Sequence, residues 1–170
     1  MREQLLKKDK IKALLLNASE EWEIYVPREG LGGDVQFDKL DEDKEASLAS
    51  LKLDYDRLAT PPKAIGFPQL ETLFEFRDGK IRSTVQNPSR KLLFGLRACD
   101  IKGMLFVDDF FRRNFEDIYY LSRLEKRLLV LVGCKQPSPY CFCTSTKTGP
   151  FLETGFDLQM VDLEDEYLVE

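Results

Sequence analysis

Two short apolar runs with a helical stretch between them constrain the fold of this chain most strongly. The runs are Lys91–Leu96 and Arg127–Val132, and both are rich in leucine. Between them, apolar residues recur at helical spacing over 101–115, and a second helical segment follows over 118–125. A strand, a helix and a strand within about 40 residues predict a right-handed βαβ unit with parallel strands.

Shorter elements are expected around this unit. Residues 3–17 have the periodicity of an amphipathic N-terminal helix, and residues 38–50 are acidic and polar, which predicts exposed surface. Residues 54–72 contain several prolines and predict an irregular connection. Strand pairs, most of them short antiparallel hairpins, are expected for 22–26 with 35–37, for 73–76 with the residues from Ile81, and for 157–163 with 167–169.

These patterns predict a mixed α/β fold class. The chain has 170 residues, with 43% hydrophobic and 32% charged residues, which suits a globular domain. We expect a single domain over 1–170, with an N-terminal appendage over about 1–50 and a cysteine-bearing α/β core over about 55–170.

Charge and composition exclude several classes of function. The net charge of −5 gives no electrostatic support to nucleic-acid binding. The longest apolar runs are too short to span a membrane, and the N-terminus lacks the apolar core of a signal peptide, which favours a cytoplasmic location. The chain has no histidine, so it can form neither a Ser-His nor a Cys-His dyad.

The four cysteines of the chain all lie in its second half. Cys99 lies just past the end of the first apolar run, and Cys134 just past the second. Ligand sites in open α/β sheets gather beyond the carboxyl ends of parallel strands. Cys141 and Cys143 lie in a polar loop over 135–150, and alternate residues of an extended segment share a face. We therefore predict that the four thiols meet in space, with Phe142 pointing into the protein.

Four thiols without histidine make one complete ligand set for an iron–sulfur cluster or for zinc. In a reducing compartment, clustered cysteines are more often metal ligands or redox groups than disulfides. Their spacing matches neither the C-x2-C pairs of zinc ribbons nor the ferredoxin run. An iron–sulfur cluster, zinc, and unligated or redox-active thiols therefore all remain open from the residues alone.

The charged residues of the helical segments are expected to face solvent. Arg112 and Arg113 and the run 123–127 have the character of solvated helix faces, or otherwise of a partner site. Asp108 and Asp109 are likewise expected to be exposed.

The second half resembles the amino-terminal domain of the beta subunit of cytoplasmic nickel–iron hydrogenases (sulfhydrogenases), a group that includes an iron–sulfur subunit of anaerobic sulfite reductase. The segments that carry the resemblance are Gly95-Leu-Arg-Ala-Cys99-Asp100, Val132-Gly-Cys134, Cys141-Phe-Cys143-Thr-Ser and Thr148-Gly-Pro150. The family usually has proline where this chain has Ala98, and Ser-Met-Gly before the Thr148-Gly-Pro150 segment. Neither departure replaces a thiol.

The resemblance implies that Cys99, Cys134, Cys141 and Cys143 bind a 4Fe–4S cluster. Around it we expect five further residues: Arg97, Asp100, Phe142, Thr144 and Ser145. Family members continue into a ferredoxin-like segment with two further clusters, which is not found in these 170 residues. A weaker likeness to the beta subunit of deazaflavin-reducing hydrogenase raises the possibility of a flavin.

Three functions follow as hypotheses. The first is an electron-transfer module that relays single electrons through the cluster between other subunits of a redox complex and a ferredoxin-like domain, without catalysis of its own. The second is a docking domain that binds zinc or no metal. The third is a flavin-containing reductase domain.

Overall fold

The computed structural model describes residues 3–30, 32–85, 89–113 and 115–170. The sheet strands, with their bounds, are β1 (Gln4–Lys7), β2 (Glu23–Glu29), β3 (Val35–Lys39), β4 (Phe74–Arg77), β5 (Lys80–Ser83), β6 (Lys91–Leu96), β7 (Arg127–Val132), β8 (Leu158–Asp162) and β9 (Glu166–Val169). The helices are α1 (Ile11–Ala18), α2 (Lys44–Ala49), α3 (Ala98–Arg113) and α4 (Ile118–Leu124), with the short 3-10 helices η1 (Lys8–Lys10) and η2 (Pro62–Ile65).

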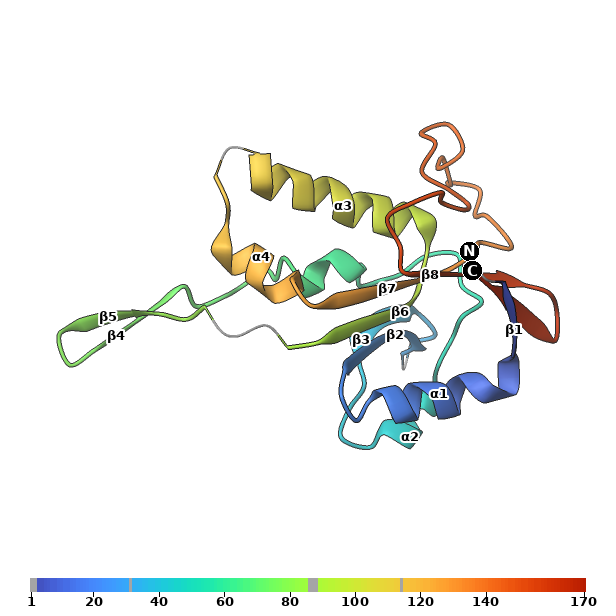
Figure 1. Cartoon of the computed structure of the whole chain (residues 1–170), viewed down its shortest axis with the longest axis horizontal. Helices are drawn as coiled ribbons and strands as arrows, with labels where there is room; N and C mark the ends of the chain where they lie inside the picture. The colour runs from blue at the N-terminus through green and yellow to red at the C-terminus, as the bar shows by residue number, and fades with distance from the viewer. Residues whose placement is uncertain (1–2, 31, 86–88, 114) are drawn as a thin grey trace.

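Seven of the strands form one sheet in the order β1-β9-β8-β7-β6-β2-β3. The neighbours β2, β6, β7 and β8 are parallel, whereas β3, β9 and β1 complete the edges in antiparallel pairs. Helices α3 and α4 cover one face, and α1 and α2 cover the other (Figure 1). The mixed α/β fold class is therefore confirmed.

The predicted βαβ unit is confirmed in its central part. Strands β6 and β7 are parallel neighbours, with Leu93 opposite Leu129, and every residue of β6 is buried. Helix α3 connects them and packs Ile101 and Met104 against the sheet. It begins at Ala98, three residues before the predicted start; the predicted range also crosses residue 114, which lies outside the described residues.

Two hydrophobic cores lie on opposite sides of the sheet, because alternate residues of a strand point to opposite faces. In β7, Val130 and Val132 join the core beneath α1, and Leu129 and Leu131 join the core beneath α3. This arrangement explains why the central strands read as continuous apolar runs.

A β-bulge at Gly95 interrupts this alternation at the end of β6. The pairing with β7 shifts between Phe94 and Leu96, and Gly95 has a φ of +88°. As a result Phe94 lies in one core and Leu96, two residues later, lies in the other. Bulges near functional sites redirect the side chains that follow them, and Arg97 and Cys99 follow this one.

The prediction of one helix over 3–17 was wrong in its first part. Gln4–Lys7 forms β1, paired with β9, and the α-helix begins only at Ile11. The two apolar residues that suggested a helical face, Leu5 and Leu6, instead lie in this edge strand. A pairing with residues about 160 positions away cannot be read from local periodicity.

The segment 38–50 is also more ordered than expected. It contains α2, whose N-terminus is capped by the Asp43 carboxylate, which accepts a hydrogen bond from the Ala46 N–H. Two residues of this helix, Ser47 and Leu48, are buried. The acidic residues around the N-terminus of α2 are exposed, and the buried side of this short helix packs against the N-terminal core.

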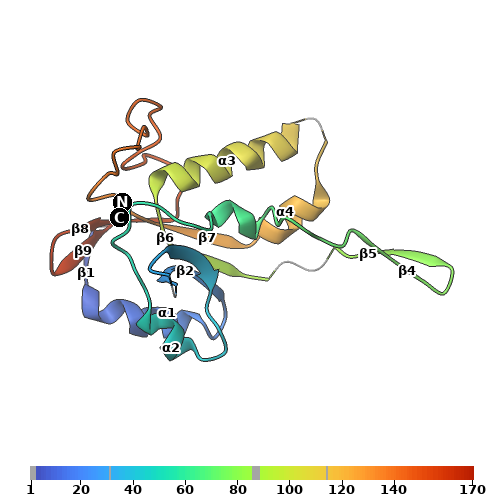
Figure 2. The same ribbon diagram turned by 180° about the vertical axis from the view of Figure 1, so that it is seen from behind.

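The expected strand pairs are confirmed. Strands β2 and β3 pair through residues 25–29 and 35–39, so β2 continues past Val26, where the prediction ended it. Strands β8 and β9 pair within the predicted segments. Strands β4 and β5 form a separate two-stranded hairpin that projects from the body of the molecule, at the opposite end from the loop 135–150 (Figures 1 and 2). Among the described residues, no helix combines the length and the apolar character needed to cross a bilayer.

Two predictions about surface charge were wrong. Asp108 is buried, pairs with Arg127 and accepts a hydrogen bond from the Tyr120 hydroxyl. Arg123 pairs with Glu71 and also donates to the Gly66 carbonyl. These charges tie α4, the start of β7 and the 54–72 connection to α3 rather than forming a solvated helix face.

Candidate metal centre

All four cysteines line one pocket, which has a volume of about 430 Å³. The pocket lies between the start of α3 and the loop 135–150, which stands above the sheet (Figure 1). Its lining is mainly apolar and includes Pro137, Tyr140 and Phe142, together with the charged residues Asp56, Arg57 and Arg97. The described cysteines form no disulfide.

Two of the thiols are placed by regular secondary structure. Cys99 is the second residue of α3, directly after β6, and Cys134 follows β7 by two residues. Because β6 and β7 are parallel neighbours, their carboxyl ends bring both residues to the same edge of the sheet. This is the arrangement in which open α/β sheets bind ligands.

The other two thiols are placed by a loop that holds its own shape through turns. The Cys143 carbonyl accepts a hydrogen bond from the Thr148 N–H at 2.8 Å, and the Phe142 carbonyl accepts from the Ser145 N–H at 3.0 Å. The Cys141 N–H donates to the Ser138 carbonyl. The N–H groups of residues 145–148 therefore close turns within the loop.

Close packing at Gly149 holds the loop against α3. A Cβ atom at this position would lie 3.3 Å from both the Cys143 Sγ and the Ala98 Cβ. Only glycine leaves this space free without displacing the thiol. Residues 143 and 149 thus meet at the base of the pocket.

Burial and neighbouring charges shift the pKa values of two thiols of the pocket. Partial burial, which removes water from the thiolate, raises the pKa of Cys99 to about 11, and the negative charge of the Asp100 carboxylate adds to this rise. Burial also raises the pKa of Cys134, and the positive charge of Arg97 opposes that rise. Like-charge repulsion from Cys141 and Cys143 also raises the pKa of Cys134, and that from Cys143 also raises the pKa of Cys99.

The residues expected around the thiols divide into two groups. Arg97, Phe142 and Thr144 line the pocket, whereas Asp100 and Ser145 are not among its lining residues. The Phe142 side chain does not point into the protein as predicted, since 69% of it is exposed.

Some lining residues were missed from the sequence. Asp56 and Arg57 come from the irregular 54–72 connection, and Tyr55 lies beneath Arg97 with its ring centroid 4.2 Å from the guanidinium carbon. No motif marks these residues. They reach the site only because this connection crosses the carboxyl edge of the sheet.

The four thiols form a complete donor set for either an iron–sulfur cluster or zinc. Zinc needs its sulfur ligands about 2.3 Å from one point, and within the described ranges no three cysteine or acidic side chains form a group that could hold a metal ion. A cluster instead takes each thiolate on a separate iron. The pocket also contains the buried cation Arg97, which an anionic group would neutralise.

Comparison with known proteins finds one informative relative. Over 123 residues the chain is 33% identical to sulfhydrogenase 2 subunit beta from Pyrococcus furiosus. The chain is similar to a hydrogenase beta subunit. The aligned part is 72% of this chain and 36% of that subunit, so the chain spans about a third of the relative's length. No protein-family model matches, and no solved structure does.

This similarity supports the resemblance seen in the cysteine motifs. The relative's name makes that protein one subunit among others.

Proposed function

We propose that this chain is the electron-transfer module of a multisubunit redox enzyme of hydrogenase type. The observation that carries the proposal is that all four thiols line one pocket at the carboxyl ends of β6 and β7. The similarity to a hydrogenase beta subunit supports it independently. We place the module in the cytoplasm, where reducing conditions keep thiols free.

In this proposal Cys99, Cys134, Cys141 and Cys143 hold one 4Fe–4S cluster. When bound, such a cluster would supply one-electron chemistry, with no bond made or broken in a substrate. The chain's own residues provide geometry. Two thiolates are fixed on rigid elements, and two lie on a loop that its own turns support.

The surface beside the pocket indicates where partners would approach. Tyr140 and Phe142 line the pocket and are largely exposed, with 84% and 69% of their surface accessible. A neighbouring subunit or a ferredoxin-like domain that covered these rings would exclude water and shorten the path for an electron. Other subunits of the redox complex are therefore the proposed partners.

Anaerobic reconstitution with iron and sulfide tests this function. We expect about four irons and four sulfides per chain, a brown protein with broad visible absorption, and a paramagnetic signal after reduction. Stoichiometric zinc in a colourless protein would instead establish the docking domain, and flavin released on denaturation would establish the reductase domain.

A second measurement addresses catalysis. The purified module should not turn over pyridine nucleotides, dyes or sulfite by itself, because a relay has no substrate site. Appreciable turnover without any added partner would contradict the assignment as a relay.

A further inference from the structure

Arg97 is a buried arginine with an unusual set of partners. Only 5% of the residue is exposed. Its Nη1 atom donates to the carbonyls of Val132 and Gly133 at 3.0 and 3.1 Å, and its Nη2 atom donates to the carbonyls of Leu53 and Tyr55. The Nε atom is buried and has no hydrogen-bond partner.

These contacts satisfy most donors but bring no carboxylate into direct contact with the charge. Burial raises the pKa of Asp100, and the positive charge of Arg97 opposes that rise from a distance. Backbone carbonyls are dipoles and carry no net charge, and in the part of the chain that the structure describes Arg97 forms no salt bridge. A charge taken out of water is costly unless an opposite charge accompanies it. The Tyr55 ring, stacked under the guanidinium, contributes only a weaker cation–π attraction.

The position of Arg97 places its positive charge beside the cysteine thiols. The residue lines the thiol pocket, stands two residues before Cys99, and donates to the carbonyl directly before Cys134. The bulge at Gly95 turns the chain so that this side chain lies at the carboxyl edge of the sheet. The anions that a loaded cysteine site would create are therefore beside a buried cation that has no carboxylate in direct contact.

We infer that Arg97 is the fixed countercharge of the cysteine site: its buried positive charge compensates the thiolate ligands and raises the reduction potential of the group they hold. This inference rests on the proposed function. Its physical basis is that a permanent cation stabilises the reduced form more than the oxidised form, because reduction adds one negative charge beside it. Arg97 acts through the ligands as a positioning and tuning residue.

The test is a redox titration of the reconstituted full chain with Arg97→Gln, Arg97→Lys and wild type. Gln removes the charge, so we expect the one-electron equilibrium to shift at least tenfold toward the oxidised form, which corresponds to about 59 mV for one electron. Lys retains the charge but cannot reproduce the four carbonyl contacts, and we expect a shift below twofold.

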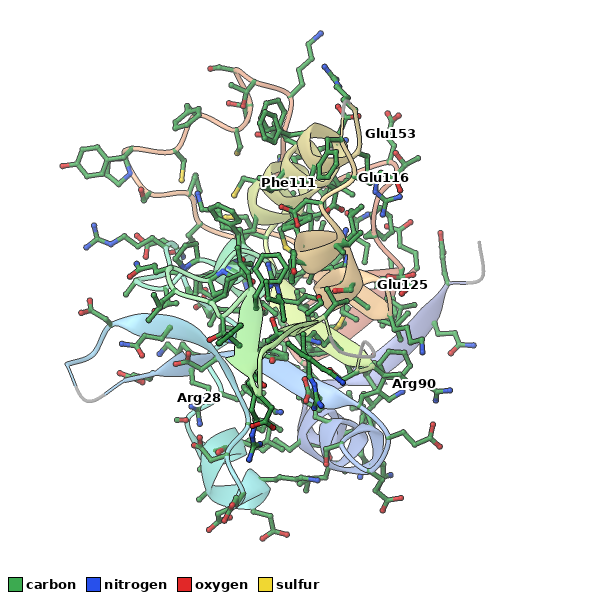
Figure 3. The ribbon with its side chains drawn as sticks, turned by 90° about the vertical axis from the view of Figure 1, so that its left-hand side faces the viewer. Arg28, Arg90, Phe111, Glu116, Glu125 and Glu153 are labelled. Carbon is green, nitrogen blue, oxygen red and sulfur yellow. The ribbon has the colours of Figure 1, made fainter. Side chains whose placement is uncertain are left out.

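Arg28 is the matched control. It is also an arginine with a buried, unpartnered Nε atom, but it has a carboxylate partner, Asp41, at 2.7 Å. It lies on the side of the sheet where α2 lies, away from α3 (Figure 3). Arg28→Gln should leave the potential unchanged.

The outcomes separate this inference from the function on which it rests. Wild type that takes up no cluster overturns both. A wild-type cluster whose potential is unchanged in Arg97→Gln overturns the inference alone, as does an equal shift in the Gln and Lys variants. If Arg97→Gln does not fold, judged by circular dichroism, Arg97→Met takes its place as the neutral variant: a shift of at least tenfold toward the oxidised form supports the countercharge, and an unchanged potential overturns it.

Discussion

The two ends of the molecule both expose apolar side chains, but they are built differently. At one end Tyr140 and Phe142 surround a pocket that contains four thiols and a buried cation. At the other end the β4–β5 hairpin exposes Phe76 and Ile81, paired across its strands, with no buried charge or thiol beside them among the described residues. Exposed apolar area alone therefore does not identify a chemical site; the buried groups next to it do.

The two ends also differ in how they are joined to the core. The cysteine pocket rests directly on β6 and β7, which are buried from end to end or nearly so. The hairpin is fully exposed along both strands and is held near its base, where the Tyr119 hydroxyl donates to the Leu73 carbonyl. Changes at the first end should affect the whole fold, and changes at the second should stay local.

The largest expected effect is on cluster content. Replacing both loop thiols, Cys141→Ser with Cys143→Ser, should reduce the iron content of the reconstituted protein from about four atoms per chain to almost none, because hydroxyls are poor ligands for these clusters. Iron and sulfide analysis measures this. Ser138→Ala is the control, since Ser138 lines the same pocket without offering a thiol, and a full cluster in the double variant would remove the loop from the ligand set.

Alanine substitution of one glycine at each end allows the stability of the two ends to be compared directly. Gly95 and Gly79 both have positive φ, +88° and +73°. A Cβ at Gly95 would lie 2.8 Å from Leu53 and 2.9 Å from Pro27, whereas one at Gly79 would meet nothing within 4 Å. We expect Gly95→Ala to cost about 3 kcal/mol through backbone strain and crowding. Gly79→Ala is also strained at its positive φ but meets no crowding, so we expect it to lower global stability by no more than about 1 kcal/mol, because local opening of the hairpin relieves the strain.

Denaturant unfolding measures both glycine variants. Gly95→Ala should also lower cluster uptake, because the bulge aims Arg97 and Cys99 at the pocket. Equal free energies of unfolding for the two variants would show that the hairpin is as much a part of the cooperative core as β6.

Removing the apolar face of the hairpin should have a small effect. Phe76→Ser with Ile81→Ser replaces two side chains that are 75% and 72% exposed. Little apolar area is buried there, so the free energy of unfolding should change by less than about 0.5 kcal/mol, with unchanged iron content. A loss above about 2 kcal/mol would mean that these side chains are buried in solution.

The last expected effect is on the pH dependence of stability near the cysteine end. Burial would raise the pKa of Asp162, but the hydrogen bond from Lys8, at 2.7 Å, and that ammonium's charge hold it below its usual value. Its stabilisation is therefore present above the unfolded-state pKa of about 4 and is lost as the pH falls through the lower folded-state pKa.

Asp162→Asn should accordingly reduce stability at pH 7 by at most about 1 kcal/mol, because the pair is partly exposed, and the difference from wild type should shrink at acid pH. Thermal unfolding at several pH values measures it, with Asp9→Asn as an exposed control. A difference that grew on acidification would reverse the sign of the linkage.

The sequence by itself determined the centre of this protein. The leucine-rich runs at Lys91–Leu96 and Arg127–Val132 predict buried parallel strands, because a strand inside a parallel sheet buries its side chains on both faces and needs apolar residues at successive positions. The right-handed crossover then placed Cys99 and Cys134 at one edge. Both conclusions follow from local pattern and chain topology alone.

Only the tertiary structure decided the features that depend on distant partners. Gln4–Lys7 is a strand because β9 offers it an open edge, and Asp108 is buried because Arg127 and Tyr120 surround it. Arg97 is buried because the carbonyls of Leu53 and Val132, from separate segments of the chain, accept its hydrogen bonds. The physical reason is common to all three: hydrogen bonds and charge pairs between residues far apart in sequence leave no periodic trace in the chain, whereas burial of apolar residues does.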